Sequence, residues 1–111
     1  MSITSSAEIA ARAPADRPDG IVAASDLLAM GMIHSFAGLI DVPREISLIG
    51  YDNNNAARES SLPISTIAQP GYELGLTAAK LLCDEIFRPG DHVHQVIKLE
   101  PHLIVRRSSS L

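Results

Sequence analysis

Apolar residues along the chain gather in short unbroken runs that alternate with longer periodic stretches. The short runs predict buried strands, at residues 21–24, 46–51, 63–68, 93–99 and 102–106. The longer stretches predict helices, at residues 9–13, 27–40 and 72–87, with one helical turn at residues 56–59. This alternation is typical of an α/β fold, with a mainly parallel sheet and crossover helices. A disordered serine tail is predicted after Arg107.

The start of the chain carries a local helix signal of its own. Ser5 is followed three residues later by Glu8, the spacing of a capping box, in which each residue satisfies a backbone amide of the other. We therefore expect the first helix to begin immediately after Ser5.

The two longer helices differ in how much of their surface is polar. In helix 72–87 the polar residues recur every three or four positions and predict one solvent-facing stripe, formed by Glu73, Thr77, Lys80, Asp84 and Arg88. From Asp26 to Ile40, in contrast, the only polar residues are Asp26, His34 and Ser35. A helix that is apolar nearly all round must be covered on more than one side. Helix 27–40 therefore indicates a second layer or a partner subunit.

Length, charge and cysteine content narrow the class of protein. The 111 residues fit one domain or part of one, and their net charge of −4 gives no cluster of Lys and Arg for DNA phosphates. No segment approaches the ~20 apolar residues of a membrane span, and no signal peptide is recognisable. The single cysteine, Cys83, excludes an internal disulfide and is expected to be a core thiol. We expect a cytoplasmic protein.

Polar residues follow three of the predicted strands, where ligands of parallel α/β sheets are bound. Asp52 comes directly after strand 46–51, and Ser25 and Asp26 follow strand 21–24. Gln69 lies beyond the third strand, where its long amide could reach a ligand or fix a hinge. Asp52 could instead form an Asx turn or cap a helix, and Asp26 could be a helix N-cap. Asp52 is the main candidate for a ligand carboxylate.

Metal and catalytic chemistry have little support in the sequence. His92 and His94 lie two residues apart, which on a strand places both rings on one face, and His102 follows. No Cys or Glu joins them at a recognised ligand spacing, so no metal site and no cofactor are predicted. Because no catalytic triad motif or glycine-rich phosphate loop is present, we expect that the chain is not an enzyme.

Four segments in a fixed order resemble the LacI/GalR family of bacterial transcription regulators. They are Pro18–Gly31, Val42–Asn53, Leu62–Pro70 with Leu74–Gly75, and Pro101–Ser108. The sensing region of that family is a two-lobed periplasmic-binding-protein type I-like fold that holds a small molecule in its cleft. The chain is similar to the last third of it, a partial fold without the helix-turn-helix headpiece.

The resemblance implies a division into lobes and a set of site residues. Residues 1–68 would belong to the C-terminal lobe, 69–98 would cross to the N-terminal lobe, and 99–107 would return, with 108–111 as a tail. Asp52 would contact the effector, and the family often has Asn at the position of Ser25. A homodimer interface is implied on the apolar helix and the loop after Asp52, formed by Leu27, Leu28, Met30, Met32, Ile33, Asn55, Arg58 and Leu62.

The sequence thus predicts the effector-sensing and dimerising portion of a LacI-type regulator. It would bind a small sugar or purine metabolite that controls repression allosterically, with DNA held only through a headpiece absent from this chain. The alternative is a fragment of a solute-binding protein of a sugar transporter, which shares the fold. A second alternative is a small doubly wound enzyme or a phospho-receiver with Asp52 as the acceptor. A receiver would need an acidic pair after its first strand and a positioned lysine. Ser25-Asp26 offers one acid, and Lys80 lies on the solvent stripe.

Overall fold

The computed structural model describes residues 5–111 and divides them into two compact units. The first comprises the described residues up to Ala68 together with Leu103–Leu111, and the second is Gln69–His102. None of the described helices combines the length and the apolarity that a membrane crossing requires.

One four-stranded sheet organises the first unit. Its strands lie in the order of the sequence, β1 (Gly20–Val22), β2 (Ser47–Tyr51), β3 (Ser65–Ala68) and β4 (His102–Ile104). β1 and β2 are parallel, with Ile21 opposite Leu48, and β2 and β3 are parallel, with Ile49 opposite Ser65. The prediction of a mainly parallel α/β sheet is confirmed.

The four described helical segments of the first unit are α1 (Ser6–Ala11), the 3₁₀ turn η1 (Pro14–Asp16), α2 (Asp26–Phe36) and α3 (Asn55–Glu59). Three of them, α1, α2 and α3, begin after a residue whose side chain accepts from a free backbone amide. The capping box of Ser5 and Glu8 is formed as predicted. α2 ends four residues earlier than predicted, and two residues beyond its end Gly38 has a φ of +76°, a conformation that favours glycine.

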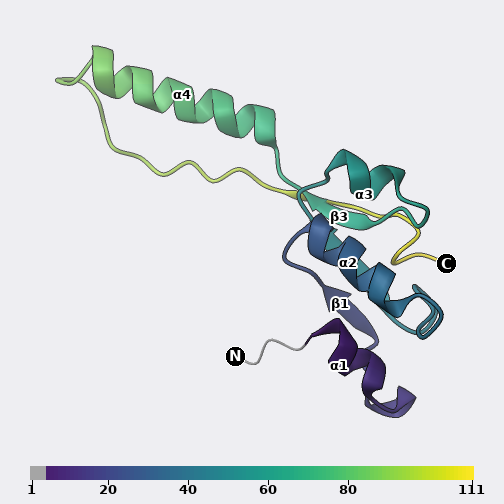
Figure 1. Ribbon diagram of the computed structural model, residues 1–111. Coiled ribbons are helices and arrows are strands. Elements are labelled where there is room, and N and C mark those ends of the chain that lie inside the picture. Colours follow the sequence, from purple (N-terminus) through teal and green to yellow (C-terminus); the bar gives the residue numbers. More distant parts are fainter. Residues whose placement is uncertain (1–4) are drawn as a thin grey trace. The chain divides into compact units, whose positions relative to one another are not determined.

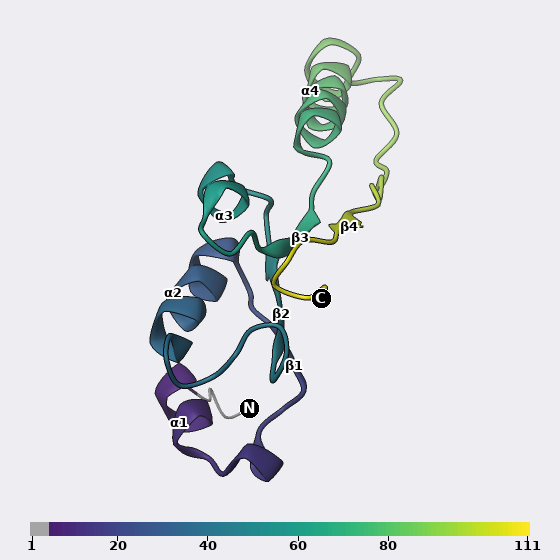
Figure 2. The same ribbon diagram turned by 90° about the vertical axis from the view of Figure 1, so that its right-hand side faces the viewer.

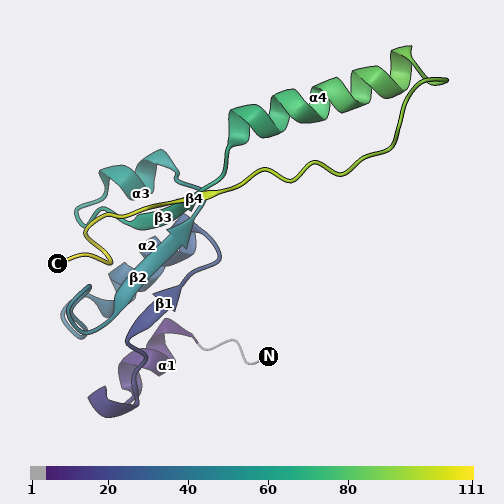
Figure 3. The ribbon, with the colours of Figure 1, turned by 180° about the vertical axis from the view of Figure 1, so that it is seen from behind.

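The core lies between α2, α3 and the sheet (Figure 2). Leu48 of β2 is fully buried against Ala29 of α2 and Ala57 of α3, and Phe36 packs with Ile46. Ser47, Ile49 and Tyr51 alternate with the buried positions of β2 and remain half-buried, as expected for the opposite face of the strand. That face of β1 and β2 is turned to the viewer in Figure 3.

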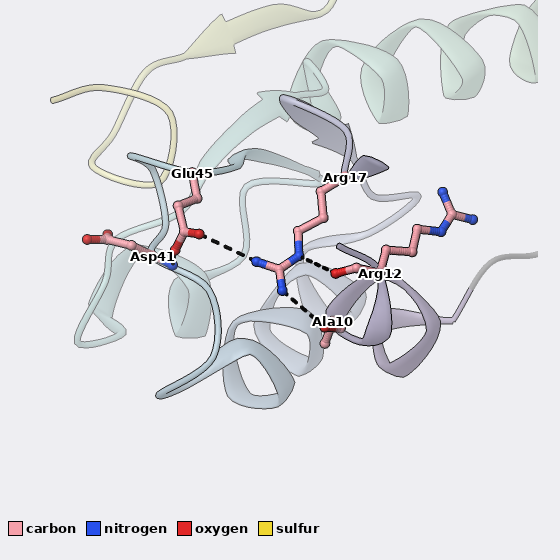
Figure 4. A network of polar contacts seen from close by, with 5 residues as sticks. All are labelled: Ala10, Arg12, Arg17, Asp41 and Glu45. Atoms are coloured by element: carbon pink, nitrogen blue, oxygen red, sulfur yellow. Dashed lines mark hydrogen bonds and ion pairs between the residues drawn. The ribbon is translucent and has the colours of Figure 1, made fainter. Parts of the chain in front are cut away.

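Arg17 ties the N-terminal segment to the rest of the first unit (Figure 4). Its guanidinium donates to the backbone carbonyls of Ala10 (3.2 Å) and Arg12 (3.1 Å) and pairs with Glu45 at 3.4 Å. Glu45 also accepts a 2.6 Å hydrogen bond from the amide of Asp41. The Glu45 carboxylate therefore links the connection that leads into β2 both to Arg17 and to the backbone of Asp41.

The predicted disorder of the serine tail is wrong at Ser108, which is fully buried. Its hydroxyl donates to the carbonyl of Leu48 (2.6 Å) and accepts from the amide of Ser65 (2.8 Å), and its own carbonyl accepts from the amide of Leu48 (2.8 Å). Ser108 thus satisfies backbone groups of β2 and of β3. The disorder was predicted from the serine-rich composition alone. A serine is also small and polar enough to be buried while it hydrogen-bonds to the backbone of two strands.

The second unit consists of α4 (Gly71–Phe87) and an extended return segment (Figure 1). No residue of α4 is buried, and large apolar side chains such as Leu74 and Leu82 are at least half exposed. Cys83 is exposed as well, so the prediction of a core thiol is wrong for this unit. Residues 93–99 form no strand, because a strand needs a neighbour for its backbone groups and no described segment pairs with this one.

Candidate functional site

The carboxyl ends of β1 and β2 bring two predicted site residues to the same edge of the sheet. Asp52 directly follows β2, and Ser25 lies three residues beyond β1. Because the two strands are parallel neighbours, their ends lie side by side. The hydroxyl of Ser25 accepts a 3.2 Å hydrogen bond from the amide of Leu28 and so forms the N-cap of α2.

Asp52 has a backbone conformation that few residues adopt. Its φ is +103°, and that of Asn53 is +58°. Asp and Asn tolerate positive φ better than other residues with a side chain, but such a conformation still carries strain that the surroundings must hold. The amide of Asp52 donates to the carbonyl of Ile67 at 3.0 Å, and its side chain is exposed. Strain of this kind is concentrated at ligand sites.

The helix cap that could have explained Asp52 belongs to another residue. The side chain of Asn54 accepts a 2.8 Å hydrogen bond from the amide of Ala57 and caps α3. Asp52 therefore is not the cap of α3. Its role as a ligand carboxylate stays a prediction.

Asp26 is the buried centre of the site. It is fully excluded from solvent, and its two carboxylate oxygens accept hydrogen bonds from the hydroxyl of Thr66 (2.7 Å) and from the amide of Asn54 (2.8 Å). The hydroxyl of Thr66 in turn accepts from the amide of Asn53 at 3.1 Å. Asp26 was considered as the N-cap of α2, but the N-cap is the preceding residue, Ser25. Asp26 instead links α2 to β3 and to the loop after β2.

Arg106 holds the same loop from the other side. One guanidinium nitrogen donates to the side-chain oxygen of Asn53 (2.7 Å), and another donates to the carbonyl of Ile64 (2.8 Å). The backbone of Arg106 is fixed by Ser65, whose hydroxyl accepts from its amide at 2.7 Å. Sequence reasoning missed both Thr66 and Arg106, because neither lies within a local motif around Asp52.

Gly50 allows α2 to approach the sheet at this point. A Cβ added to Gly50 would overlap Oδ1 of Asp26 and lie 3.1 Å from its Cα. Only glycine therefore permits the buried carboxylate to sit against β2. In the Gly-Tyr-Asp sequence, Gly50 therefore leaves room for the Asp26 side chain, and Asp52 follows two residues later.

Gln69 lies in the second unit, which it begins, and its side chain is exposed. It follows β3 directly in the chain. The role predicted for Gln69 in ligand binding or as a hinge stays a prediction.

The residues predicted to form a dimer interface lie on α2, on α3 and, at Leu62, in the segment after α3. Leu27 and Leu28 are 72% and 56% exposed, whereas Met30, Met32 and Ile33 are half-buried against the core. Arg58 and Asn55 are exposed and joined by a 2.9 Å hydrogen bond. Beside them lies a shallow hollow between α2 and the segment after α3, lined by Met30, Ile33, His34, Ala37, Ser60, Ser61, Leu62 and Ile64.

Comparison with known proteins places this arrangement in a family. Residues 2–109 match the model of a periplasmic binding protein-like domain. The HTH-type transcriptional repressor PurR of Photobacterium profundum is 40% identical over 95 residues, which cover 84% of this chain and 28% of the repressor. The chain belongs to the LacI/GalR family of transcription regulators.

Two solved structures of LacI family regulators share the fold. The regulator of Enterococcus faecium with bound ribose is 34% identical with a TM-score of 0.77, covering 94% of this chain and 39% of that one. The regulator of Lactobacillus casei with bound sucrose is 30% identical with a TM-score of 0.79, covering 94% and 38%. The LacI/GalR chain described here therefore corresponds to a part of its relatives.

Membership in this family decides between the classes that the sequence left open. The matched relatives are transcriptional repressors, so the prediction that the chain is not an enzyme is confirmed. A LacI-type regulator is favoured over a transport protein for the same reason.

Two glycines make the packing at Asp26 testable. Gly50→Ala should lower the free energy of unfolding by about 1–3 kcal/mol, because its Cβ overlaps Asp26. Gly31→Ala, inside α2 with open space around its Cβ, should raise it by about 0.8–1 kcal/mol. Urea unfolding of both variants measures the difference. Equal effects of the two changes would contradict a close approach at Gly50.

Proposed function

We propose that the chain is the effector-sensing and dimerising portion of a LacI-type regulator. A small sugar or purine metabolite binds beyond the carboxyl ends of β1 and β2, and DNA is held by a headpiece outside these residues. The observation that carries the proposal is Asp52, an exposed acid on a strained turn that a buried network keeps in place.

Asp52 is the proposed ligand carboxylate, with Ser25 and Gln69 as weaker contacts. A carboxylate reads a sugar or base edge well, because an analogue without the matching donors leaves its oxygens unpaired. Asp26 has a different role in this proposal. Its two oxygens already accept from Thr66 and Asn54 in the interior, so it positions the loop and makes no ligand contact.

A sugar is the effector class with the most direct support. The regulators from Enterococcus faecium and Lactobacillus casei have ribose and sucrose bound, at 30% identity or more. A purine remains in the proposal as the second class. The test below therefore includes both.

Control of repression would depend on how the effector changes the arrangement of the two lobes of the full regulator. In the proposal the first unit belongs to the C-terminal lobe, and residues 69–98 belong to the N-terminal lobe. Effector bound at Asp52 would favour one arrangement of the lobes, and repression would change by the difference in affinity between the arrangements. The proposed location of the regulator is the cytoplasm, where the chromosome lies.

The homodimer interface is proposed on α2 and α3. Leu27 and Leu28 are exposed next to Met30 and Ile33, and together they form an apolar patch on α2. A second copy of the chain would bury this patch. The exposed apolar residues of α4, such as Leu74 and Leu82, are assigned to a different neighbour, the remainder of the N-terminal lobe.

Thermal unfolding with a panel of ribose, sucrose, glucose, adenine and guanine tests the ligand site. A ligand at about 100 times its dissociation constant adds ~2.7 kcal/mol, which raises the midpoint by roughly 10–20 °C for a chain of this size. Asp52→Ala should weaken binding by about 10–150-fold through the lost charged hydrogen bonds. Asp16→Ala, an exposed acid on η1, is the matched control and should leave binding unchanged.

The same panel is run on the chain fused behind the first two thirds of the Photobacterium profundum relative. Binding by the fusion alone would show that the other lobe supplies part of the pocket. If neither protein binds any compound, or if Asp52→Ala binds as tightly as the parent, Asp52 is not the effector carboxylate.

Light scattering at a series of dilutions tests the interface. We expect a dimer for the parent chain and a monomer for Leu28→Glu, because a charge on α2 would be buried without a partner. Leu39→Glu is the control, since Leu39 is 63% exposed just beyond α2 and outside the proposed interface. A monomeric parent chain, or a Leu28→Glu dimer of undiminished strength, would contradict the assignment.

A further inference from the structure

Three metal-ligating side chains meet at the end of α4 in the second unit. Glu85 lies in the last turns of the helix, and His92 and His94 lie on the return segment beyond the turn at Pro89–Asp91. Their ligand atoms all lie within 4.8 Å of one another. We refer to these residues as the Glu85–His92–His94 cluster.

The spacing of the two histidines matches a metal site. Nε2 of His92 and Nδ1 of His94 are 3.3 Å apart. Two nitrogens bound to one zinc ion at about 2.0–2.1 Å, in tetrahedral geometry, are separated by roughly 3.4 Å. The rings stand edge to face, with centroids 4.8 Å apart and planes at 88°, so that the two nitrogens meet while the carbon edges stay apart.

A hydrogen bond between the two rings would account for the histidine pair by itself. It would not account for the third side chain, since the Glu85 carboxylate comes from a different element and has an oxygen within 4.8 Å of both histidine ligand atoms. The surroundings also favour a cation. Asp84 and Asp91 line the adjoining hollow with Arg88, so two acids and one base accompany the cluster.

We propose that the Glu85–His92–His94 cluster binds a divalent transition-metal ion, with zinc as the ion that fits its ligands. Two imidazole nitrogens and one carboxylate oxygen supply three positions of a tetrahedral site, and water fills the fourth. Rotation of the exposed Glu85 side chain closes the remaining distance. The bound ion would fasten the return segment to the end of α4, independently of any effector at Asp52.

Titration calorimetry with zinc chloride tests this site on the untagged chain carrying Cys83→Ser. That background is needed because Cys83 is exposed and a thiol also binds zinc. We expect one ion per chain. Zinc binding should weaken by at least about tenfold in each of the variants His92→Ala, His94→Ala and Glu85→Gln. Loss of a residue that only supports a ligand already lowers metal affinity by about 10–100-fold, and loss of the ligand itself should lower it at least as much.

Matched controls exist on the same unit. His102→Ala removes a histidine outside the cluster, and Glu73→Gln removes an exposed acid in the first turn of α4, so both should leave the affinity unchanged. Visible spectra with cobalt in place of zinc should show tetrahedral coordination that His92→Ala removes. The proposal is overturned if Cys83→Ser alone abolishes binding, if the cluster variants bind like the parent, or if His102→Ala weakens binding as much as they do.

Discussion

The buried carboxylate of Asp26 is the constraint on which the site depends. A charge excluded from solvent is stable only if hydrogen bonds replace its water, and Asp26 has one donor for each oxygen, Thr66 and Asn54. These donors lie on β3 and in the loop after β2, while Asp26 itself begins α2. Gly50 leaves the space that this contact needs. One side chain thus fixes three elements relative to one another.

The strained turn at Asp52 follows from that arrangement. Positive φ at Asp52 and Asn53 is held by three successive backbone amides, since Asp52 donates to the carbonyl of Ile67, Asn53 to the hydroxyl of Thr66 and Asn54 to the carboxylate of Asp26. The loop is therefore organised before any ligand arrives, which reduces the entropy lost on binding. The two acids therefore have different roles. Asp26 supports the turn, and Asp52 is proposed to bind the effector.

Short-range signals in the sequence predicted most of the elements and none of the long-range contacts. The capping box of Ser5, the strand before Asp52 and the periodicity of α4 are encoded within a few residues. The bond from Thr66 to Asp26 spans 40 residues and that from Ser108 to Leu48 spans 60, so no local pattern marks them. Glu85 was missed beside His92 and His94 for a different reason, because the turn after α4, rather than a regular helix or strand spacing, creates its proximity.

Replacing Thr66 by Val tests the central interaction most directly. The substitution keeps the shape of the side chain and removes the hydroxyl that donates to Asp26 and accepts from Asn53. Urea unfolding should show a loss of about 1.5–3 kcal/mol, as for a hydrogen bond to a buried charge. Thr77→Val, at a half-buried position of α4, is the control and should stay within about 0.5 kcal/mol of the parent. A Thr66→Val chain as stable as that control would contradict the account.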